Sequence, residues 1–379
     1  MTDAVGTPAQ PAGTFREPAG TAPAMSQRGL NRATLARQLL LERAAMPAVD
    51  AVAHLAGMQS QAPLAPYVGL WTRLADFDPA ELADLTTGRA VLRAHLMRTT
   101  VHLVTAADYL AWHGLFAPLH ARSFASQPFA SQLAGAVVPE LLAVARPLLA
   151  ERPRTRRELG ELLAARWPEA DRTSLAYAVH HHLPALQTPP RGVWGSTGPA
   201  TWTTVESWLG RPVDADPAPD QLVLRYLAAY GPATVADVQA WSGLTRLREV
   251  VDRLPLRRFA GGLYDLPDAP RPDPDTPAPP RFLPEYDNLL LSYADRTRVN
   301  PDRRRVPLPP GNGAAGGTLL VDGLWHGEWS LRRAKDEARL RVSLYHPVAD
   351  EEALAEEGGT LLEFLAPEAG TREVEISGR

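Results

Sequence analysis

Residues 220–266 carry the pattern that most restricts the fold of this chain, because three helical stretches are followed there by a short hairpin. An apolar stripe of leucine, valine and tyrosine marks the first helix, which ends at a Gly-Pro dipeptide. Thr234, with Asp237 three residues later, forms an acidic variant of the capping box and begins the second helix. Thr245 begins the third helix, and two short apolar runs then surround a Gly-Gly turn. Three helices followed by a hairpin predict a winged helix.

The same order of elements recurs upstream, without obvious sequence identity. Thr155 and Glu158 form a capping box, and a later helix is expected at 173–183. The runs 186–188 and 193–194, joined by a Pro-Pro-Arg-Gly turn, resemble a second wing. Nearer the N-terminus, the expected helices are 32–43, 48–56, 66–74 and one that starts at Asp78, and the expected strands are 91–96 and 101–104. The pattern predicts about three winged-helix-like modules in series.

A linker dense in proline and aspartate separates these modules from a small, mostly antiparallel β domain. The strands expected in that domain are 289–291, 318–321, 327–331, 340–344 and 360–364. The fold class is therefore α+β, with tandem winged-helix modules followed by a C-terminal β domain. The expected organisation is a disordered tail at 1–28, modules at 29–135, 136–212 and 213–267, the linker at 268–280, the β domain at 281–365 and a tail at 366–379.

The chain contains no cysteine, which excludes disulfides, thiolate nucleophiles, iron–sulfur clusters and cysteine-based zinc sites. Three consecutive histidines, 180–182, would point about 100° apart on a helix, and no acidic residues have metal-ligand spacing. Neither a metal nor a cofactor is therefore expected. The formal net charge of −4 does not mark a nucleic-acid binder, but acids and arginines are segregated along the chain, so a local basic face remains open.

The sequence favours a cytoplasmic protein without a membrane partner. No stretch approaches the roughly 18 consecutive apolar residues of a membrane helix. The first 26 residues lack the basic start and the apolar core of a signal peptide.

Two glutamines, Gln59 and Gln61, stand one residue apart between two expected helices. In locally extended backbone their side chains would face the same way. The plain alternative is that they satisfy loop backbone groups or cap the next helix, since glutamine is an ordinary loop residue. On these residues alone both interpretations stay open.

Two further segments give the pair a context. Residues 96–104 read Leu-Met-Arg-Thr-Thr-Val-His-Leu-Val, and residues 281–292 read Arg-Phe-Leu-Pro-Glu-Tyr-Asp-Asn-Leu-Leu-Leu-Ser. Together with Gln59 and Gln61, these segments resemble the AlkZ-like DNA glycosylases, a winged-helix family that also includes the YcaQ type. The Gln-x-Gln spacing matches the AlkZ-like branch, whereas the YcaQ-like branch has Gln-x-Asp. The resemblance covers residues 30–365.

The resemblance implies a DNA glycosylase that excises N7-alkylated purines, including bulky natural-product adducts and interstrand crosslinks. Gln59 and Gln61 would then hold the attacking water at the sugar, and the β-domain hairpin and the wings would hold double-stranded DNA. The hairpin of the family contains Arg-Gly-Thr, which is Arg98-Thr99-Thr100 here, so the glycine is lost.

The candidate DNA contacts come from the hairpin, the second wing and the β domain. They are Arg98, Thr99, His102, Arg191, Trp194, Arg296 and Arg298. For His102, a core position is as good an interpretation as a DNA contact. For each arginine, the alternative is an exposed residue that only reflects an arginine-rich composition.

A glutamine pair suits this chemistry better than it suits most hydrolyses. An amide cannot act as a general base near neutral pH. An N7-alkylated purine, however, is already cationic and leaves readily through an oxocarbenium-like sugar. The enzyme then has mainly to orient one water, which two amide oxygens can do.

Lys335 is the only lysine, and it lies in a run of charged residues. Bifunctional glycosylases cleave the strand through an amine that forms a Schiff base. The sequence therefore predicts a monofunctional enzyme that leaves an abasic site. The competing hypothesis is a winged-helix DNA-binding protein without chemistry, such as a transcriptional regulator. A regulator would usually be a dimer, whereas serial modules suit a monomer that cups a duplex. Self-resistance to a genotoxic metabolite and general repair are both open.

Overall fold

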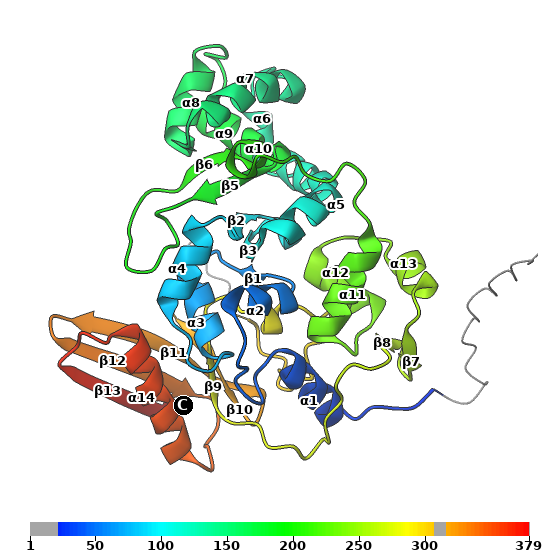
Figure 1. Cartoon of the computed structure of the whole chain (residues 1–379), viewed down its shortest axis with the longest axis vertical. Coiled ribbons are helices and arrows are strands. Elements are labelled where there is room, and N and C mark those ends of the chain that lie inside the picture. Colours follow the sequence, from blue (N-terminus) through cyan, green and yellow to red (C-terminus); the bar gives the residue numbers. More distant parts are fainter. Residues whose placement is uncertain (1–21, 307–315, 379) are drawn as a thin grey trace, which may run out of the picture.

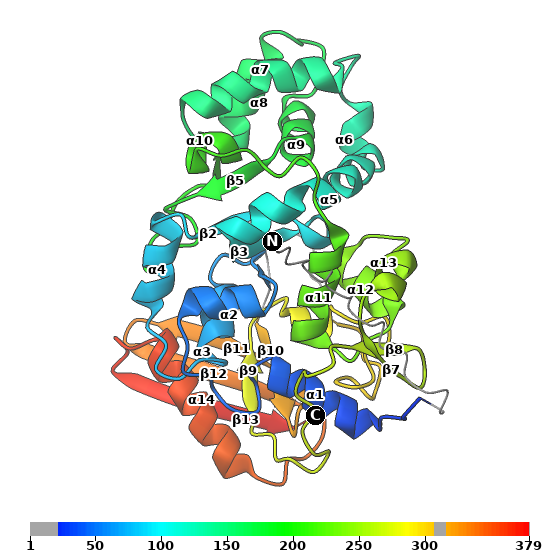
Figure 2. The same ribbon diagram turned by 45° about the vertical axis from the view of Figure 1, so that its right-hand side comes forward.

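The computed structural model describes residues 22–306 and 316–378. Most of the tail expected at 1–28 therefore lies outside the described residues, and the first helix, α1 (Gln27–Arg37), begins within it. Two lobes stand at opposite ends of the molecule, with a mixed central part between them (Figures 1 and 2). Within the described part of the chain, no helix is both long enough and apolar enough to cross a membrane.

A six-stranded sheet forms the middle of the molecule. Its strands, in spatial order, are β1 (Met58–Gln59), β3 (Val101–Thr105), β2 (Val91–His95), β5 (Ala185–Thr188), β6 (Thr201–Thr204) and β4 (Arg154–Thr155). β2 pairs with β5 through Arg93 opposite Gln187 and Ala94 opposite Leu186. The boundary expected near residue 136 therefore does not separate two sheets, because one sheet continues across it.

Short helices surround the first three strands. They are α2 (Ala48–His54), α3 (Ala65–Trp71), α4 (Pro79–Thr87) and the single 3-10 turn η1 (Met97–Thr99) between β2 and β3. Asp78 caps α4 by accepting from the backbone N–H of Ala80, and the proline at position 79 fixes the first turn. The helices expected at 48–56, at 66–74 and from Asp78 and the strands expected at 91–96 and 101–104 lie where the apolar spacing predicts them. The helix expected at 32–43 is wrong in its second half, because α1 ends at Arg37.

A helical lobe covers the other end of the sheet and stands at the top of Figures 1 and 2. Its helices are α5 (Ala106–Ala125), α6 (Pro128–Ser131), α7 (Val138–Glu151), α8 (Arg156–Ala164), α9 (Arg172–His182) and α10 (Val205–Leu209). The predicted capping box is confirmed, because Thr155 accepts from the N–H of Glu158 and the Glu158 carboxylate accepts from the N–H of Thr155.

The prediction of the second strand in the second wing is wrong. β5 pairs with Thr201–Thr204, not with Val193 and Trp194, so residues 189–200 form one long loop that we call the β5–β6 loop. Two prolines at its start cannot donate ladder hydrogen bonds, and Gly192 has a φ of +85°. The strand resumes only in the Thr-Trp-Thr-Thr run.

The pattern at 220–266 forms three helices and a hairpin, as expected, but the third helix begins at Arg248 and Thr245 does not cap it. These elements are α11 (Pro219–Tyr230), α12 (Val235–Ser242), α13 (Arg248–Arg253), β7 (Arg257–Phe259) and β8 (Leu263–Asp265). Thr234 and Asp237 form the predicted capping box of α12. The Gly-Gly turn has φ values of 77° and 73°, the left-handed backbone that glycine tolerates best.

The C-terminal part is a five-stranded sheet covered by one helix. The elements are β9 (Arg281–Leu283), the 3-10 turn η2 (Asn288–Leu290), β10 (Gly317–Val321), β11 (Leu324–Ala334), β12 (Glu337–Leu344), α14 (Glu351–Leu365) and β13 (Thr371–Gly378). The spatial order of the strands is β13-β12-β11-β10-β9, antiparallel except for β12 and β13, which are parallel.

Three expectations for this part are wrong. Residues 360–364 are helical, because α14 buries Leu354, Leu361 and Leu362 at helical spacing after the Asp350 cap. Residues 289–291 do not form a strand, since Asp287 accepts from the N–H of Leu289 and closes a 3-10 turn. The tail expected at 366–379 contains β13, which adds to the sheet beside β12.

Helix α1 joins the module at 213–267 to the C-terminal part. Arg37 donates to Asp265 at 2.6 Å, and neither side chain is more than 1% exposed. One turn earlier, Arg32 pairs with Asp322. The expected linker is irregular but held in place, since Arg32 also donates to the carbonyl of Thr276 at 2.6 Å. These buried contacts fix the frame in which the strands β1 to β3 lie.

Candidate active site around two glutamines

Gln59 ends an edge strand of the six-stranded sheet, and Gln61 follows two residues later. In β1, Met58 lies opposite Leu103, and Gln59 lies opposite His102 of β3. The ladder extends past Gln59, since the N–H of Ser60 donates to the carbonyl of Val101 at 2.8 Å. Gln61 then lies in a bend, and the two glutamines line different cavities: Gln59 lines one with Arg73 and Asn288, and Gln61 lines another with Arg93.

The amide of Gln59 is held by a buried arginine. Arg98 Nη2 donates to Gln59 Oε1 at 2.8 Å and to Asn288 Oδ1 at the same distance, while Nη1 donates to the carbonyl of Trp241. Asn288 in turn donates to the carbonyl of Gly57 at 3.2 Å. Gln59 is only 7% exposed, so its amide oxygen has a fixed position.

The amide of Gln61 is held by the backbone. The N–H of Val101 donates to Gln61 Oε1 at 3.3 Å. A carbonyl oxygen has two lone pairs, so the Gln59 amide oxygen can accept a hydrogen bond in addition to the one from Arg98. Amide oxygens can orient a water molecule but cannot remove its proton near neutral pH.

His102 is part of the support under this strand. Its side chain is fully buried, its Nδ1 lies 3.1 Å from the carbonyl of Thr100, and its Nε2 lies 3.4 Å from Arg98 Nη2. Burial, and then the charge of Arg98, lower the pKa of His102 to about 3. The ring is therefore neutral at physiological pH, with Nδ1 as donor and Nε2 as acceptor. This geometry does not fit the DNA contact expected of His102.

Arg98 and Thr99 form the tight turn between β2 and β3. Both have positive φ values, 52° and 59°, in the left-handed region that favours glycine. Thr99 Oγ1 donates to the carbonyl of Arg98 at 2.6 Å, a local bond that helps to hold this conformation. The turn thus keeps a glycine-type geometry without the glycine, and it aims the Arg98 guanidinium at Gln59. Burial lowers the pKa of Arg98 to about 10.

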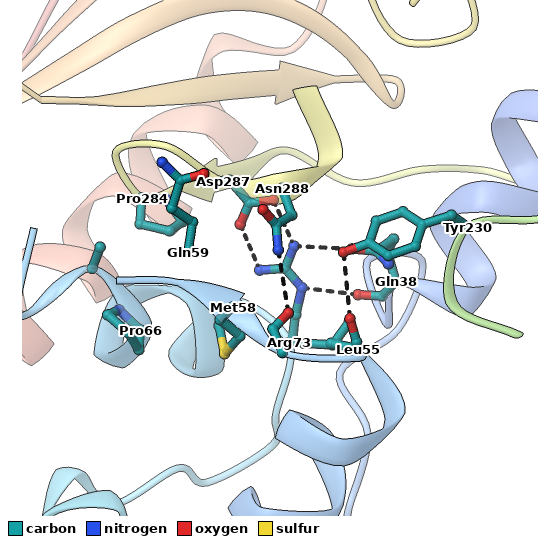
Figure 3. A pocket seen from close by; sticks show the side chains of 12 residues that line it. Gln38, Leu55, Met58, Gln59, Pro66, Arg73, Tyr230, Pro284, Asp287 and Asn288 are labelled. Carbon is teal, nitrogen blue, oxygen red and sulfur yellow. Dashed lines mark hydrogen bonds and ion pairs between the residues drawn. The ribbon is translucent and has the colours of Figure 1, made fainter. Parts of the chain in front are cut away.

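A second buried arginine closes the space behind Gln59 (Figure 3). Arg73 pairs with Asp287 at 2.9 Å and donates to the carbonyl of Gln38 at 3.1 Å. In Figure 3 the Gln59 side chain extends from β1 toward the segment that carries Asp287 and Asn288. The cavity enclosed there has a volume of about 10 Å3, which suits a single water molecule and is far too small for a purine.

Ser60, between the two glutamines, is held by Arg93 of β2. Arg93 Nε donates to Ser60 Oγ at 2.9 Å, and Nη2 donates to the Ser60 carbonyl at 2.8 Å. Sequence reasoning missed Arg93, Asn288 and Arg73. A charged residue inside the apolar run of β2 was a usable signal for Arg93, but the arginine-rich composition hid it.

The β5–β6 loop closes over the same strand. Tyr67 of α3 donates to the carbonyl of Gly192 at 3.1 Å and accepts from the N–H of Trp194 at 3.0 Å. The ring of Trp194 lies 5.0 Å from that of Tyr67. Arg191 and Trp194 therefore reach the glutamine segment, although from a loop and not from a hairpin.

Trp194 and Arg191 border an open groove of about 610 Å3, which we call the wide groove. It begins at residues 62–65, directly after Gln61, and its far wall is β11 of the C-terminal sheet. Its described lining residues are Ala62, Pro63, Leu64, Ala65, Val68, Arg191, Gly192, Trp194, Ser196, Thr197, Gly198, Glu285, Gly316, Trp329, Leu331, Arg333 and Leu365.

The two remaining candidate contacts lie elsewhere. Arg298 is 5% exposed, donates to the carbonyl of Pro232 at 2.8 Å and lies over the ring of Tyr293, so its contacts are internal. Arg296 is partly exposed, and its charge lowers the pKa of Arg98 slightly further. Among the residues that the structure describes, no group of three or more His, Asp or Glu could hold a metal ion.

Comparisons with known proteins agree with the resemblance in the sequence. The family model described as "DNA glycosylase AlkZ-like" matches residues 52–364. Among solved structures, the DNA glycosylase AlkZ of Streptomyces sahachiroi is similar with a TM-score of 0.68 and 20% identity. That match covers 94% of this chain and 100% of the other, and at this identity it shows a shared fold. No curated protein matches.

Replacing Thr99 by glycine is expected to raise the free energy of unfolding by about 1 kcal/mol, because glycine removes the left-handed strain at this position. Thr100→Gly is the matched control. Thr100 has a φ of −104°, so glycine there should lower the free energy of unfolding by about 0.5–1 kcal/mol. Urea unfolding of both variants measures the difference, and an equal destabilisation by both would contradict the strained turn.

Proposed function

The chain belongs to the AlkZ-like DNA glycosylase family, and on that premise we propose that it hydrolyses the N-glycosidic bond of N7-alkylated purines in double-stranded DNA. Gln59 and Gln61 orient the attacking water in this proposal. Membership of an enzyme family favours this function over the transcriptional regulator considered from the sequence.

One observation carries the proposal: both amide oxygens are fixed by donors from the β2–β3 hairpin. Arg98 holds Gln59 at 2.8 Å, and the Val101 N–H holds Gln61 at 3.3 Å. Fixed acceptors need little reorganisation when a water binds, which is the condition for effective positioning. Gln61 does satisfy a backbone group, but a glutamine with only that role would not need the buried arginine that holds Gln59.

The chemistry then depends on the leaving group. The carboxylate of Asp287, which lines the same small cavity as Gln59, is paired with Arg73, and the imidazole of His102 has its pKa lowered to about 3. In the proposal, water attack therefore follows departure of a good leaving group. A cationic N7-alkylpurine meets this requirement, whereas a neutral base such as uracil does not. The proposal therefore includes selectivity for cationic lesions.

The wide groove supports a place for bulky adducts. Its volume of about 610 Å3 lies in the range of small-molecule sites, and Trp194 and Trp329 offer aromatic surface to a planar group. Glu285 is the one acidic residue among its described lining residues, and burial raises its pKa. A cationic purine beside this carboxyl would favour its ionised form, which adds attraction for the charged lesion.

Exposed basic residues on two hairpins fit a duplex partner, and one of these hairpins, β11–β12, borders the wide groove. The β11–β12 hairpin exposes Arg332, Arg333 and Lys335, and the β7–β8 hairpin exposes Arg257 and Arg258. Such arginines contact phosphates or enter the minor groove. In the proposal these hairpins hold the duplex while the lesion faces β1.

Gln59→Ala and Gln61→Ala are each expected to lower the single-turnover rate of N7-methylguanine excision about 100-fold, because each removes one acceptor for the water. Gln61→Glu retains an acceptor oxygen at the same place and should keep most of the activity. Alkali-labile strand breaks in a labelled duplex measure excision. Gln221→Ala, on an exposed position of α11, is the matched control and should equal the wild type.

If both alanine variants excise at the wild-type rate, the catalytic assignment fails even though the family holds. Efficient release of uracil or hypoxanthine by the wild type would contradict the selectivity for cationic lesions.

The excision rate is expected to stay constant between about pH 5.5 and 8.5, because no group at the glutamine pair titrates there. His102, with its pKa lowered to about 3, is neutral throughout this range. Arg98, with its pKa lowered to about 10, stays charged until the pH rises toward that value. A stopped assay corrected for spontaneous depurination measures the profile. An inflection near pH 6–7 would indicate a titrating general base and contradict the proposal.

Borohydride is expected to trap no covalent adduct with lesion DNA, since Lys335 lies exposed in the turn between β11 and β12 and carries the only side-chain amine. Lys335→Arg should keep full excision. Electrophoresis of the borohydride-treated reaction measures adducts, and an adduct that Lys335→Arg abolishes would show a lyase activity instead.

A further inference from the structure

A second cavity lies on the other side of the glutamine segment from the wide groove. It has a volume of about 310 Å3, and we call it the basic cavity. Its described lining residues are Gln61, Arg93, His95, Val101, Thr155, Arg156, Arg157, Gln187, Arg191, Pro199, Ala200 and Trp202. Four of these residues are arginines, none is acidic, and Gln61 forms part of the wall.

The arginines of the basic cavity differ from the paired buried arginines of the fold. A carboxylate neutralises the charge in pairs such as Arg37–Asp265, Arg73–Asp287 and Arg281–Glu357, whereas Arg98 is held by neutral groups. Among the described residues, no carboxylate lies within 4.0 Å of a guanidinium nitrogen of the four arginines at the basic cavity. The nearby acid Glu158 is already bonded to Thr155 and Arg152.

Neutral groups hold these guanidinium groups in place. Arg93 is 3% exposed and donates to Gln187 Oε1 at 2.6 Å in addition to Ser60. Arg156 lies 4.3 Å from the ring centre of Tyr177 and donates to His180 Nδ1 at 3.0 Å. Burial lowers the pKa of both arginines, so their charge lacks the compensation that a buried pair provides.

The β5–β6 loop packs against the deep arginine. A Cβ built at Gly192 would lie 2.6 Å from Arg93 Cδ, so the loop backbone touches this side chain. The outer wall is formed by Arg157 and Pro199, which are exposed. Solvent, or a ligand, therefore enters the basic cavity past Arg157. The guanidinium charges of Arg93 and Arg156, which lack a carboxylate partner among the described residues, lie further inside.

We propose that the basic cavity binds one backbone phosphate of the DNA strand that carries the lesion. The inference rests on the proposed function, because that function brings the DNA to Gln61. A phosphodiester is an anion with oxygen acceptors on several sides, which matches convergent guanidinium groups that lack a carboxylate. The cavity has room for this group, and a phosphate there fixes the strand beside the water-positioning pair.

Methylphosphonate interference tests the proposal. The probe is a duplex with a tetrahydrofuran abasic analogue, in which one phosphate at a time, within four positions on either side, is replaced by a neutral methylphosphonate. For the wild type, one position should weaken binding about tenfold at constant salt. In the Arg156→Gln variant, the same methylphosphonate should not weaken binding further, because the arginine charge that contacted this phosphate is already absent. The slope of log Kd against log salt should fall by about one.

Two further variants make the outcome decisive. Arg157→Gln changes an exposed side chain, and it repeats the test if Arg156→Gln fails to fold by circular dichroism. Arg146→Gln is the matched control, since Arg146 is exposed on α7 and pairs with Glu206 at 3.0 Å. This control should keep the wild-type interference pattern.

The proposal is overturned if, at every position, the methylphosphonate weakens duplex binding equally in the wild type and in the variants. It is also overturned if inorganic phosphate binds and stabilises the wild type but no backbone position is coupled to Arg156 or Arg157, since the cavity then takes a free anion. Because the probe contains no glycosidic bond, this test is independent of excision. A failed excision assay with positive interference would therefore refute the proposed chemistry alone.

Discussion

Buried guanidinium groups tie together segments that are far apart in the sequence, and the site depends on these ties. Arg37 on α1 reaches Asp265 on β8, and Arg73 reaches Asp287 beside η2. Removing one partner of such a buried pair typically costs about 3–5 kcal/mol, a large part of a typical stability of about 5–15 kcal/mol. The segment that carries Asn288 is held against β1 by the second pair, so Arg98 can contact Gln59 and Asn288 together.

The arginines around the glutamines, in contrast, have no carboxylate partner among the residues that the structure describes. Arg98, Arg93 and Arg156 are enclosed by amides, carbonyls and rings and have no carboxylate within ion-pair distance in the described part of the chain. A buried charge without a partner of opposite charge lowers the stability of the protein. In the absence of DNA, these arginines are therefore less favourably placed than the paired arginines of the frame. DNA is the ligand of the family, and its phosphates carry the opposite charge in a dense array.

The sequence predicted local elements well and long-range pairing poorly. Capping boxes such as Thr155 with Glu158 depend on neighbours three residues apart, so their outcome could be read from the chain. The partner of β5 could not, because Val193–Trp194 and Thr201–Thr204 both have strand-forming residues and only tertiary packing decides between them. The same limit applies to the site. The Gln-x-Gln spacing marked Gln59 and Gln61. Arg93 reaches the segment between them through the sheet, whereas Asn288 reaches it through the packing of η2.

A cationic lesion would be repelled by these arginines if nothing neutralised them. On the proposed function, the approach of a charged purine to Gln59 and Gln61 therefore becomes favourable only after backbone phosphates occupy the positive sites nearby. A free N7-alkylated nucleoside brings the same cation without the neighbouring phosphates, so it meets the repulsion uncompensated. The charge pattern thus makes the DNA backbone part of lesion recognition. Neutral amides then have an advantage over a carboxylate pair. On the proposed function they orient water without neutralising the adjacent arginines, so the guanidinium charge stays available to the strand.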